Sequence, residues 1–147
     1  MIVYDATDAI LGRLSSIIAQ QLLAGEEVIV INVEKAVVAG DPLKILRKYE
    51  QRLNLKTKTN PRRGPFYPRT AQGILKRSVR GMVPWQSKTG RESMKRLKIH
   101  LGEPANIEEE PRICPFQAKD LVCNYITLGE IAKRLGGVQV PKGWLKQ

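Results

Sequence analysis

The stretch that decides the fold is residues 27–33, EVIVINV. Its β-branched residues Val28, Ile29, Val30 and Ile31 follow one another without the polar alternation of a strand that has one wet face. Uninterrupted runs of this kind are typical of strands buried on both sides, and such strands belong to parallel sheets covered by helices. The run therefore predicts an α/β domain built around a buried parallel strand.

The residues before this run predict a strand followed by a helix. Residues 1–5, MIVYD, have the composition of a short strand. Asp8 is expected to cap the next helix, because its carboxylate can accept from free N–H groups of the first turn. Gly25 suits the helix end, and Gly12 is expected to allow close packing against a neighbour. The apolar residues that recur at helical spacing are Ile10, Leu14, Ile17, Ile18 and Leu22.

The residues after the run predict further helices and short strands. Residues 36–40 form a strand or a tight loop, and Asp41-Pro42 is a strong helix start for residues 41–53. Helices are also expected at 70–80, capped by Thr70 and closed by Gly81, at 89–98 and at 128–135. Residues 97–101 alternate like a strand and therefore overlap the expected end of the helix at 89–98, and residues 125–127 suit another strand. We expect residues 1–147 to form a single domain.

The positive charge is concentrated in one part of the chain. The whole sequence carries 25 Lys and Arg against 14 Asp and Glu, a net charge of +11. Residues 42–98, which we call the basic segment, hold 17 of these cations and only two acids, Glu50 and Glu92. The remaining residues are mildly acidic. This uneven distribution of charge indicates that the basic segment is a binding surface for a polyanion. Common polyanions are nucleic acid and anionic membranes.

Within the basic segment, we expect residues at about 52–98 to form an RNA-binding insert. Residues 54–69 have no periodicity and are interrupted by Pro and Gly, so they predict a long functional or disordered loop. The next two expected helices each carry cations on one side. Those of the second helix form a stripe of Lys88, Arg91, Lys95 and Lys98. The expected RNA contacts are Arg52, Lys56, Lys58, Arg62, Arg63, Arg69, Lys76, Arg77, Arg80, Lys88, Arg91, Lys95, Arg96 and Lys98.

Three aromatic residues lie among these cations. Tyr67 and Trp85 are candidates for stacking on unpaired RNA bases. The alternative is packing against the helices of the insert itself. We favour packing for Phe66 and leave both readings open for Trp85.

Other chemistry has little support in the sequence. His100 is the single histidine, and Cys114 and Cys123 do not form a metal-binding pair, so we expect no metal site. Asp5, Asp8 and Asp41 lie near expected strand ends, where α/β enzymes place catalytic groups, but helix capping is the favoured role. Glu108-Glu109-Glu110 is expected in a solvated loop, and Trp144 is expected to hold the C-terminal tail unless that tail is frayed.

No apolar run long enough for a membrane-spanning helix occurs, and no signal peptide is expected. Two alternative functions follow from the composition. An enzyme would have to use Asp5, Asp8, Asp41 or the acidic triplet. A protein of the membrane surface would need large aromatic residues opposite the cations of its helices, and residues 89–98 offer only Met94 and Leu97.

Several ordered motifs resemble the ribosomal protein L13 family of the large subunit, in its archaeal form. The resemblance covers nearly all of the chain to about residue 136. The motifs are LGRLSS at 11–16, residues 32–40, NPRRGPF at 60–66, VRGMVP at 79–84, TGR at 89–91, LK at 97–98 and GEP at 102–104. The matched cations are Arg62, Arg63, Arg80, Arg91 and Lys98. Tyr67, Trp85 and Gln86 depart from the residues that family members often carry.

The resemblance implies a three-layer α/β/α fold around a mainly parallel four-stranded sheet. It also implies a structural, non-catalytic constituent of the cytoplasmic ribosome. Such a protein binds large-subunit ribosomal RNA, contacts neighbouring ribosomal proteins, and supports subunit assembly and translation. No cofactor, small-molecule substrate or membrane is expected as a partner.

Overall fold

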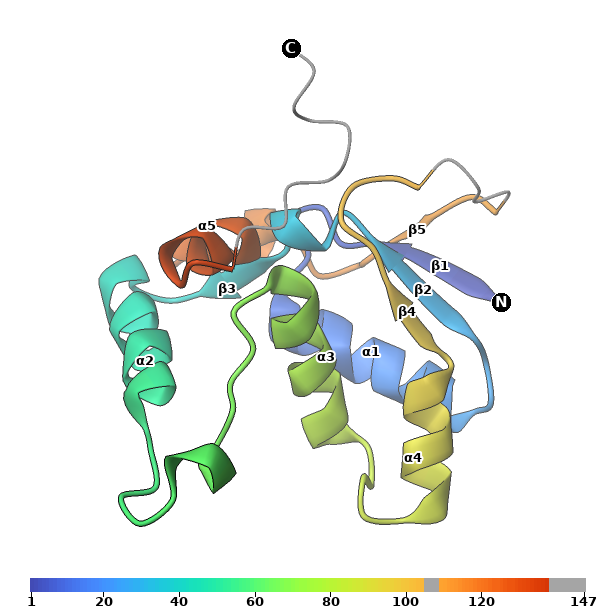
Figure 1. The fold of residues 1–147 in the computed structure, drawn as a ribbon. Helices are drawn as coiled ribbons and strands as arrows, with labels where there is room; N and C mark the ends of the chain where they lie inside the picture. The colour runs from blue at the N-terminus through green and yellow to red at the C-terminus, as the bar shows by residue number, and fades with distance from the viewer. Residues whose placement is uncertain (105–108, 138–147) are drawn as a thin grey trace.

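The computed structural model describes residues 1–104 and 109–137, and its central feature is a parallel sheet (Figure 1). The strands of this sheet are β1 (Ile2–Asp5), β2 (Val28–Ile31), β4 (Leu97–Ile99) and β5 (Arg112–Ile113). Their order is β4-β2-β1-β5, and every neighbouring pair is parallel. The predicted α/β fold with a mainly parallel four-stranded sheet is confirmed, and the arrangement is consistent with the three-layer class.

The run that predicted this fold occupies an inner position of the sheet. All four residues of β2 are buried, and Tyr4 of β1 lies in register with Val30. Side chains of successive strand residues alternate between the two faces. Accordingly, Val28 and Val30 belong to the main core, whereas Ile29 and Ile31 form a second buried cluster with Val3. The strand ends at Ile31, before the predicted limit, because Asn32 adopts a left-handed conformation with φ 53° and starts a 3₁₀ turn at Val33–Lys35.

Three helices pack together against this sheet and beside one another (Figure 1). They are α1 (Leu11–Leu23), α3 (Ala71–Met82) and α4 (Lys88–Lys95). Leu14, Ile18 and Leu22 of α1 are completely buried, as are Leu75 and Val79 of α3. Burial of each of these side chains contributes about 1.5–3 kcal/mol relative to exposure. The buried side chains of α3 therefore fix the position of this helix, which carries cations on its exposed side.

A second, smaller sheet joins distant parts of the chain. Strand β3 (Val37–Ala39) pairs antiparallel with β6 (Tyr125–Thr127), which leads directly into α5 (Leu128–Arg134). Helix α2 (Pro42–Asn54) has no fully buried residue, although one side of it packs against the core. Glu50 of α2 accepts a hydrogen bond from Arg134 of α5 at 3.0 Å. The remaining 3₁₀ turns lie at Pro61–Arg63 and Ala118–Asp120.

The predicted caps of two helices are confirmed. The Asp41 side chain accepts from the Leu43 N–H at 3.0 Å, and the Thr70 hydroxyl accepts from the Gly73 N–H at 3.2 Å. The prediction that Asp8 caps α1 is wrong, because α1 begins only at Leu11. Residues before it are engaged elsewhere, since Ala9 and Ile10 form bridges to Gln117 and Val37.

Other expected details also differ. A Cβ at Gly12 would meet no atom within 4 Å, so this glycine does not serve close packing. Gly81 does not close α3, which continues to Met82 and ends because Pro84 keeps Val83 extended. Helix α4, predicted at 89–98, starts at Lys88, capped by Ser87, and ends at Lys95 because the residues from Leu97 pair with β2. Lys98 therefore lies on a strand and is not part of the predicted helical stripe.

The two cysteines are both free thiols, Cys114 buried and Cys123 exposed. Glu109 and Glu110 are exposed. Glu108 and the tail with Trp144 lie outside the described residues. Within residues 1–104 and 109–137, no helix is long and apolar enough to cross a membrane.

Candidate nucleic-acid interface

The cations of the basic segment have very few acidic partners. In residues 1–104 and 109–137, the ion pair made by a cation of this segment is Lys88 to Glu92, at 3.9 Å. The acid Glu50 is occupied by Arg134, which lies outside the segment. Of the predicted contact residues, Arg52 and Arg96 are partly buried and all the others are exposed. The segment therefore presents a strong positive potential that carboxylates of the described chain do not neutralise.

Helices α3 and α4 enclose a basic groove of about 610 Å³. Lys76, Arg77 and Arg80 line it from α3, and Arg91 and Lys95 line it from α4. The spacing of three and four residues brings cations of one helix onto a single face. Trp85, Met94 and Leu97 supply apolar lining. Thus the groove combines an apolar floor with five positive charges, and these charges suit the phosphates of a nucleic-acid backbone.

The first turn of α4 depends on a close approach at Gly90, which is buried. A Cβ at this position would overlap the backbone of Pro84, including its carbonyl oxygen. Glycine is the residue that permits such contact between two backbones. The Ser87 hydroxyl, which accepts from the Gly90 N–H at 3.1 Å, fixes the start of α4 at the same place.

The variant Gly90→Ala is expected to be destabilised by about 1–3 kcal/mol, because backbone rather than a flexible side chain must move. Thermal unfolding measures this effect. The matched control is Gly81→Ala on α3, where a Cβ meets no atom within 4 Å. That control should be neutral or up to about 1 kcal/mol more stable, since alanine is the better helix former. Equal stability of the two variants would contradict the close-approach argument.

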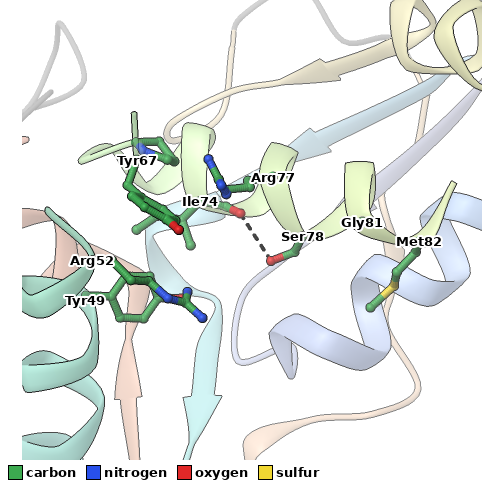
Figure 2. A pocket seen from close by; sticks show the side chains of 9 residues that line it. Tyr49, Arg52, Tyr67, Ile74, Arg77, Ser78, Gly81 and Met82 are labelled. Atoms are coloured by element: carbon green, nitrogen blue, oxygen red, sulfur yellow. Dashed lines mark hydrogen bonds between the residues drawn. The ribbon is translucent and has the colours of Figure 1, made fainter. Parts of the chain in front are cut away.

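A second depression, the α2–α3 cleft, has a volume of about 470 Å³ and a different lining (Figure 2). Tyr49 and Arg52 of α2 form one wall. Arg77, Ser78 and Met82 of α3 belong to the opposite wall. The other lining residues are Tyr67, Pro68, Ile74 and Gly81. The cleft thus brings together two tyrosines and two guanidinium groups.

Arginine side chains cover aromatic rings around both depressions. The Arg77 guanidinium lies 4.2 Å from the centre of the Tyr67 ring, and Arg80 lies 4.2 Å from that of Trp85. Arg52 lies 5.4 Å from the Tyr49 ring and 5.9 Å from the Tyr67 ring. These cation–π contacts hold the guanidinium groups in place. Tyr67 and Trp85, the two candidates for stacking on bases, therefore each support an arginine side chain.

The ionisation of Tyr49 reflects its position. Burial raises the pKa of the Tyr49 phenol above its usual value, and the nearby Arg52 guanidinium offsets part of that rise. Desolvation disfavours the phenolate, whereas a positive neighbour favours it. Tyr49 therefore presents a neutral hydroxyl and ring to the cleft at physiological pH.

The loop between α2 and α3 presents cations at the far end of the molecule from the sheet (Figure 1). Lys56, Lys58, Arg62 and Arg63 are all exposed there. The Asn60 side chain accepts from the Arg62 N–H at 3.2 Å and starts the short 3₁₀ turn. The motif Asn-Pro-Arg-Arg thus forms a defined turn that carries two adjacent arginines.

Phe66 is 74% exposed, so the prediction that it packs against helices of the insert is wrong. Its carbonyl oxygen accepts from Arg77 Nη1 at 2.9 Å. The backbone at this position is used to hold an arginine, and the ring is left in solvent.

Arg96 and Lys98 are predicted contact residues that do not line the groove. The Arg96 guanidinium donates to the Leu22 carbonyl oxygen at 2.8 Å and approaches the Ser93 hydroxyl at 3.3 Å. It therefore ties the end of α4 to the end of α1. Lys98 follows the buried Leu97 along β4, and strand alternation turns its side chain to the other face of the sheet.

Several residues of this surface were not among the RNA contacts predicted from the sequence. Lys44, Arg47 and Lys48 are exposed on α2, although their charge was included in the count for residues 42–98. Tyr49 gave no signal beyond its helical spacing with apolar neighbours. Its position in the cleft depends on how α2 lies relative to α3.

Of the residues considered for catalysis, Asp5 and Asp41 have structural contacts through their carboxylates, and Asp8 has one through its backbone. Asp5 accepts from the Thr7 hydroxyl at 2.7 Å and from the Asn32 side-chain amide at 3.2 Å. Asp41 caps α2. The Asp8 backbone carbonyl accepts from the Ala118 N–H at 2.7 Å. In the part of the chain that the structure covers, no three His, Cys, Asp or Glu side chains gather as a metal site.

Comparison with known proteins finds one family model and several relatives, and all of them name the same ribosomal protein family. Residues 1–106 match the family described as Ribosomal protein L13. The large ribosomal subunit protein uL13 of Methanopyrus kandleri is 43% identical over 147 aligned residues, covering 96% of this chain and 89% of the relative. The protein of the same name from Methanocaldococcus jannaschii is 41% identical, with 92% and 98% covered. That from Haloarcula marismortui is 38% identical, with 92% and 90% covered.

Proposed function

Because the chain belongs to the ribosomal protein L13 family, we propose that it is a structural constituent of the large ribosomal subunit. In this role it binds large-subunit ribosomal RNA, contacts neighbouring ribosomal proteins and acts in the cytoplasmic ribosome without catalysing a reaction. The α/β domain serves as a rigid support, and the insert at about residues 52–98 binds the RNA. The charge distribution and the named relatives support this proposal together.

The observation that carries the proposal is the unneutralised charge of the basic segment. Cations on the exposed surfaces of α3, α4 and the preceding loop have almost no carboxylate partners among the described residues. Lys and Arg release condensed counterions when they neutralise phosphates, and this release drives association. RNA supplies the phosphates that would compensate the repulsion between these side chains.

The double substitution Arg62→Ala with Arg63→Ala is expected to weaken RNA binding by at least about tenfold, with little change in thermal unfolding. Both side chains are exposed on the turn at Pro61–Arg63, and exposed substitutions usually change stability by less than about 0.5 kcal/mol. Filter binding to large-subunit ribosomal RNA, with parallel unfolding curves, measures the two effects. Loss of the fold would show that these arginines serve structure.

A matched control removes the same charge from outside the basic segment. Lys35 and Lys119 are exposed and lie in the acidic remainder of the chain. The double variant Lys35→Ala with Lys119→Ala should bind RNA almost as tightly as the original chain. Equal losses in both double variants would mean that net charge, and not the Asn-Pro-Arg-Arg turn, determines affinity. Sucrose-gradient fractionation then asks whether the protein travels with the large subunit.

A further inference from the structure

We propose that the α2–α3 cleft binds one unpaired nucleotide of the RNA, with the base inside the cleft and its phosphate against Arg52 and Arg77. This inference rests on the proposed function and adds a division of labour to it. The groove between α3 and α4 contacts backbone phosphates, and the cleft recognises a base that has left the stack.

The lining of the cleft has the chemistry that a nucleotide requires. Tyr49 and Tyr67 provide aromatic surface, while Ile74 and Met82 provide apolar surface. Stacking of bases on aromatic side chains tolerates any sequence because every base has a π face. Arg52 and Arg77 provide positive charge, and none of the described residues that line the cleft is Asp or Glu. A planar ring joined to a phosphate matches this combination of surfaces.

The two depressions differ in a way that separates base from backbone. Among the described lining residues, the α3–α4 groove has five cations with one aromatic residue, Trp85, whereas the cleft has two cations with two aromatic residues, Tyr49 and Tyr67. Arg77 and Pro68 line both depressions, so the two are adjacent. A strand whose phosphates follow the groove therefore passes the mouth of the cleft. Bases within an RNA duplex are paired and stacked, so only an unpaired base can enter.

The guanidinium contacts already present favour binding of a planar ligand. Arg77 lies over Tyr67, and its Nη1 donates to the Phe66 carbonyl oxygen at 2.9 Å. The side chain is thus oriented before the ligand arrives, which reduces the entropy lost on binding. A guanidinium plane supported in this way can stack on a base and also donate to phosphate oxygen.

Gly81 provides a direct steric test. It lines the cleft from α3, and a Cβ there would meet no atom within 4 Å. A leucine at this position can therefore fill space in the cleft without displacing backbone. Gly12 offers the matched control, because it also lies in a helix with open space around its Cβ and does not line the cleft.

The experiment observes methyl groups of the full chain by NMR during RNA titration. The Met82 methyl reports the cleft, and the Met1 methyl serves as a distant reference. A single-stranded oligoadenylate is expected to shift the Met82 signal through the ring current of an inserted adenine. A perfectly paired RNA duplex of equal length should bind without shifting it. Adenosine monophosphate at the same nucleotide concentration should give a much smaller shift.

The variants give the quantitative result. Gly81→Leu should abolish the Met82 shift and weaken single-strand binding by about 5- to 150-fold, the range for loss of one stacked base. Gly12→Leu should change neither quantity. Tyr49→Leu removes the aromatic ring from the opposite wall and should lower both, which gives a second variant if Gly81→Leu unfolds.

The possible failures are distinguishable. If oligoadenylate binds with strong salt dependence while the Met82 signal stays in place, the cleft proposal is overturned and RNA binding stands. An equal shift with free adenosine monophosphate would assign the cleft to a free nucleotide and overturn its assignment to RNA. Absence of binding to any RNA would overturn the proposed function as well.

Discussion

The affinity of this protein for large-subunit ribosomal RNA is expected to fall about 10⁴-fold when salt rises from about 50 to about 200 mM. Neutralisation of about eight phosphates gives a slope of roughly −6 to −7 for log K against log salt. Eight is fewer than the exposed cations of the basic segment, so the surface can supply this number without full engagement. A titration of binding across this salt range measures the slope.

Two outcomes would count against this interpretation. A slope near −2 would mean that only two or three phosphates are neutralised and that most of the exposed cations have another purpose. Binding to anionic lipid vesicles in flotation, without comparable binding to RNA, would assign the same charge to a membrane surface.

The second large effect is a loss of stability expected at Leu75 of α3 but not at the neighbouring Lys76. Leu75 is completely buried between α3 and the core, whereas Lys76 is exposed in the groove. Leu75→Ala should lower the free energy of unfolding by about 2–5 kcal/mol, because it removes buried methyl groups and leaves a cavity. For a chain of this size, the corresponding fall in Tm is about 5–20 °C. Thermal unfolding measures this change.

Lys76→Ala is the matched substitution on the exposed face. It should leave stability within about 0.5 kcal/mol, while the salt slope becomes shallower by about 1, because one phosphate contact is lost. Leu75→Ala, assayed below its lowered Tm, should retain the original slope. If Lys76→Ala unfolded the chain or left the slope unchanged, its position in the groove would not be a binding position.

The fold was largely predictable where local sequence and tertiary structure agree. The β-branched residues of β2 indicated a strand buried on both faces, and Asp41 and Thr70 cap their helices as expected. The prediction failed at Asp8, where bridges from Ala9 and Ile10 to distant residues delay the start of α1. It also extended α4 too far, because pairing with β2 ends that helix earlier. Partners far along the chain decided both cases.

The candidate interface was predictable as a charged region but not as a shape. Charge counting located the basic segment, since an excess of cations over acids is visible in the sequence. It could not place Arg77 between two depressions or show that Arg96 binds the Leu22 carbonyl. Those positions depend on helix orientation, which composition does not encode. Tyr49 illustrates the same limit, because α2 brings it opposite α3 only in the folded chain.

The order of strands in the sheet has a consequence for chain continuity. The inner strands β1 and β2 precede the loop at residues 55–60, and the edge strands β4 and β5 follow it. Helices α1 and α3 come from opposite sides of that loop and make extensive contact. The two halves are thus interleaved, so a protease nick in the loop would leave both fragments bound to each other.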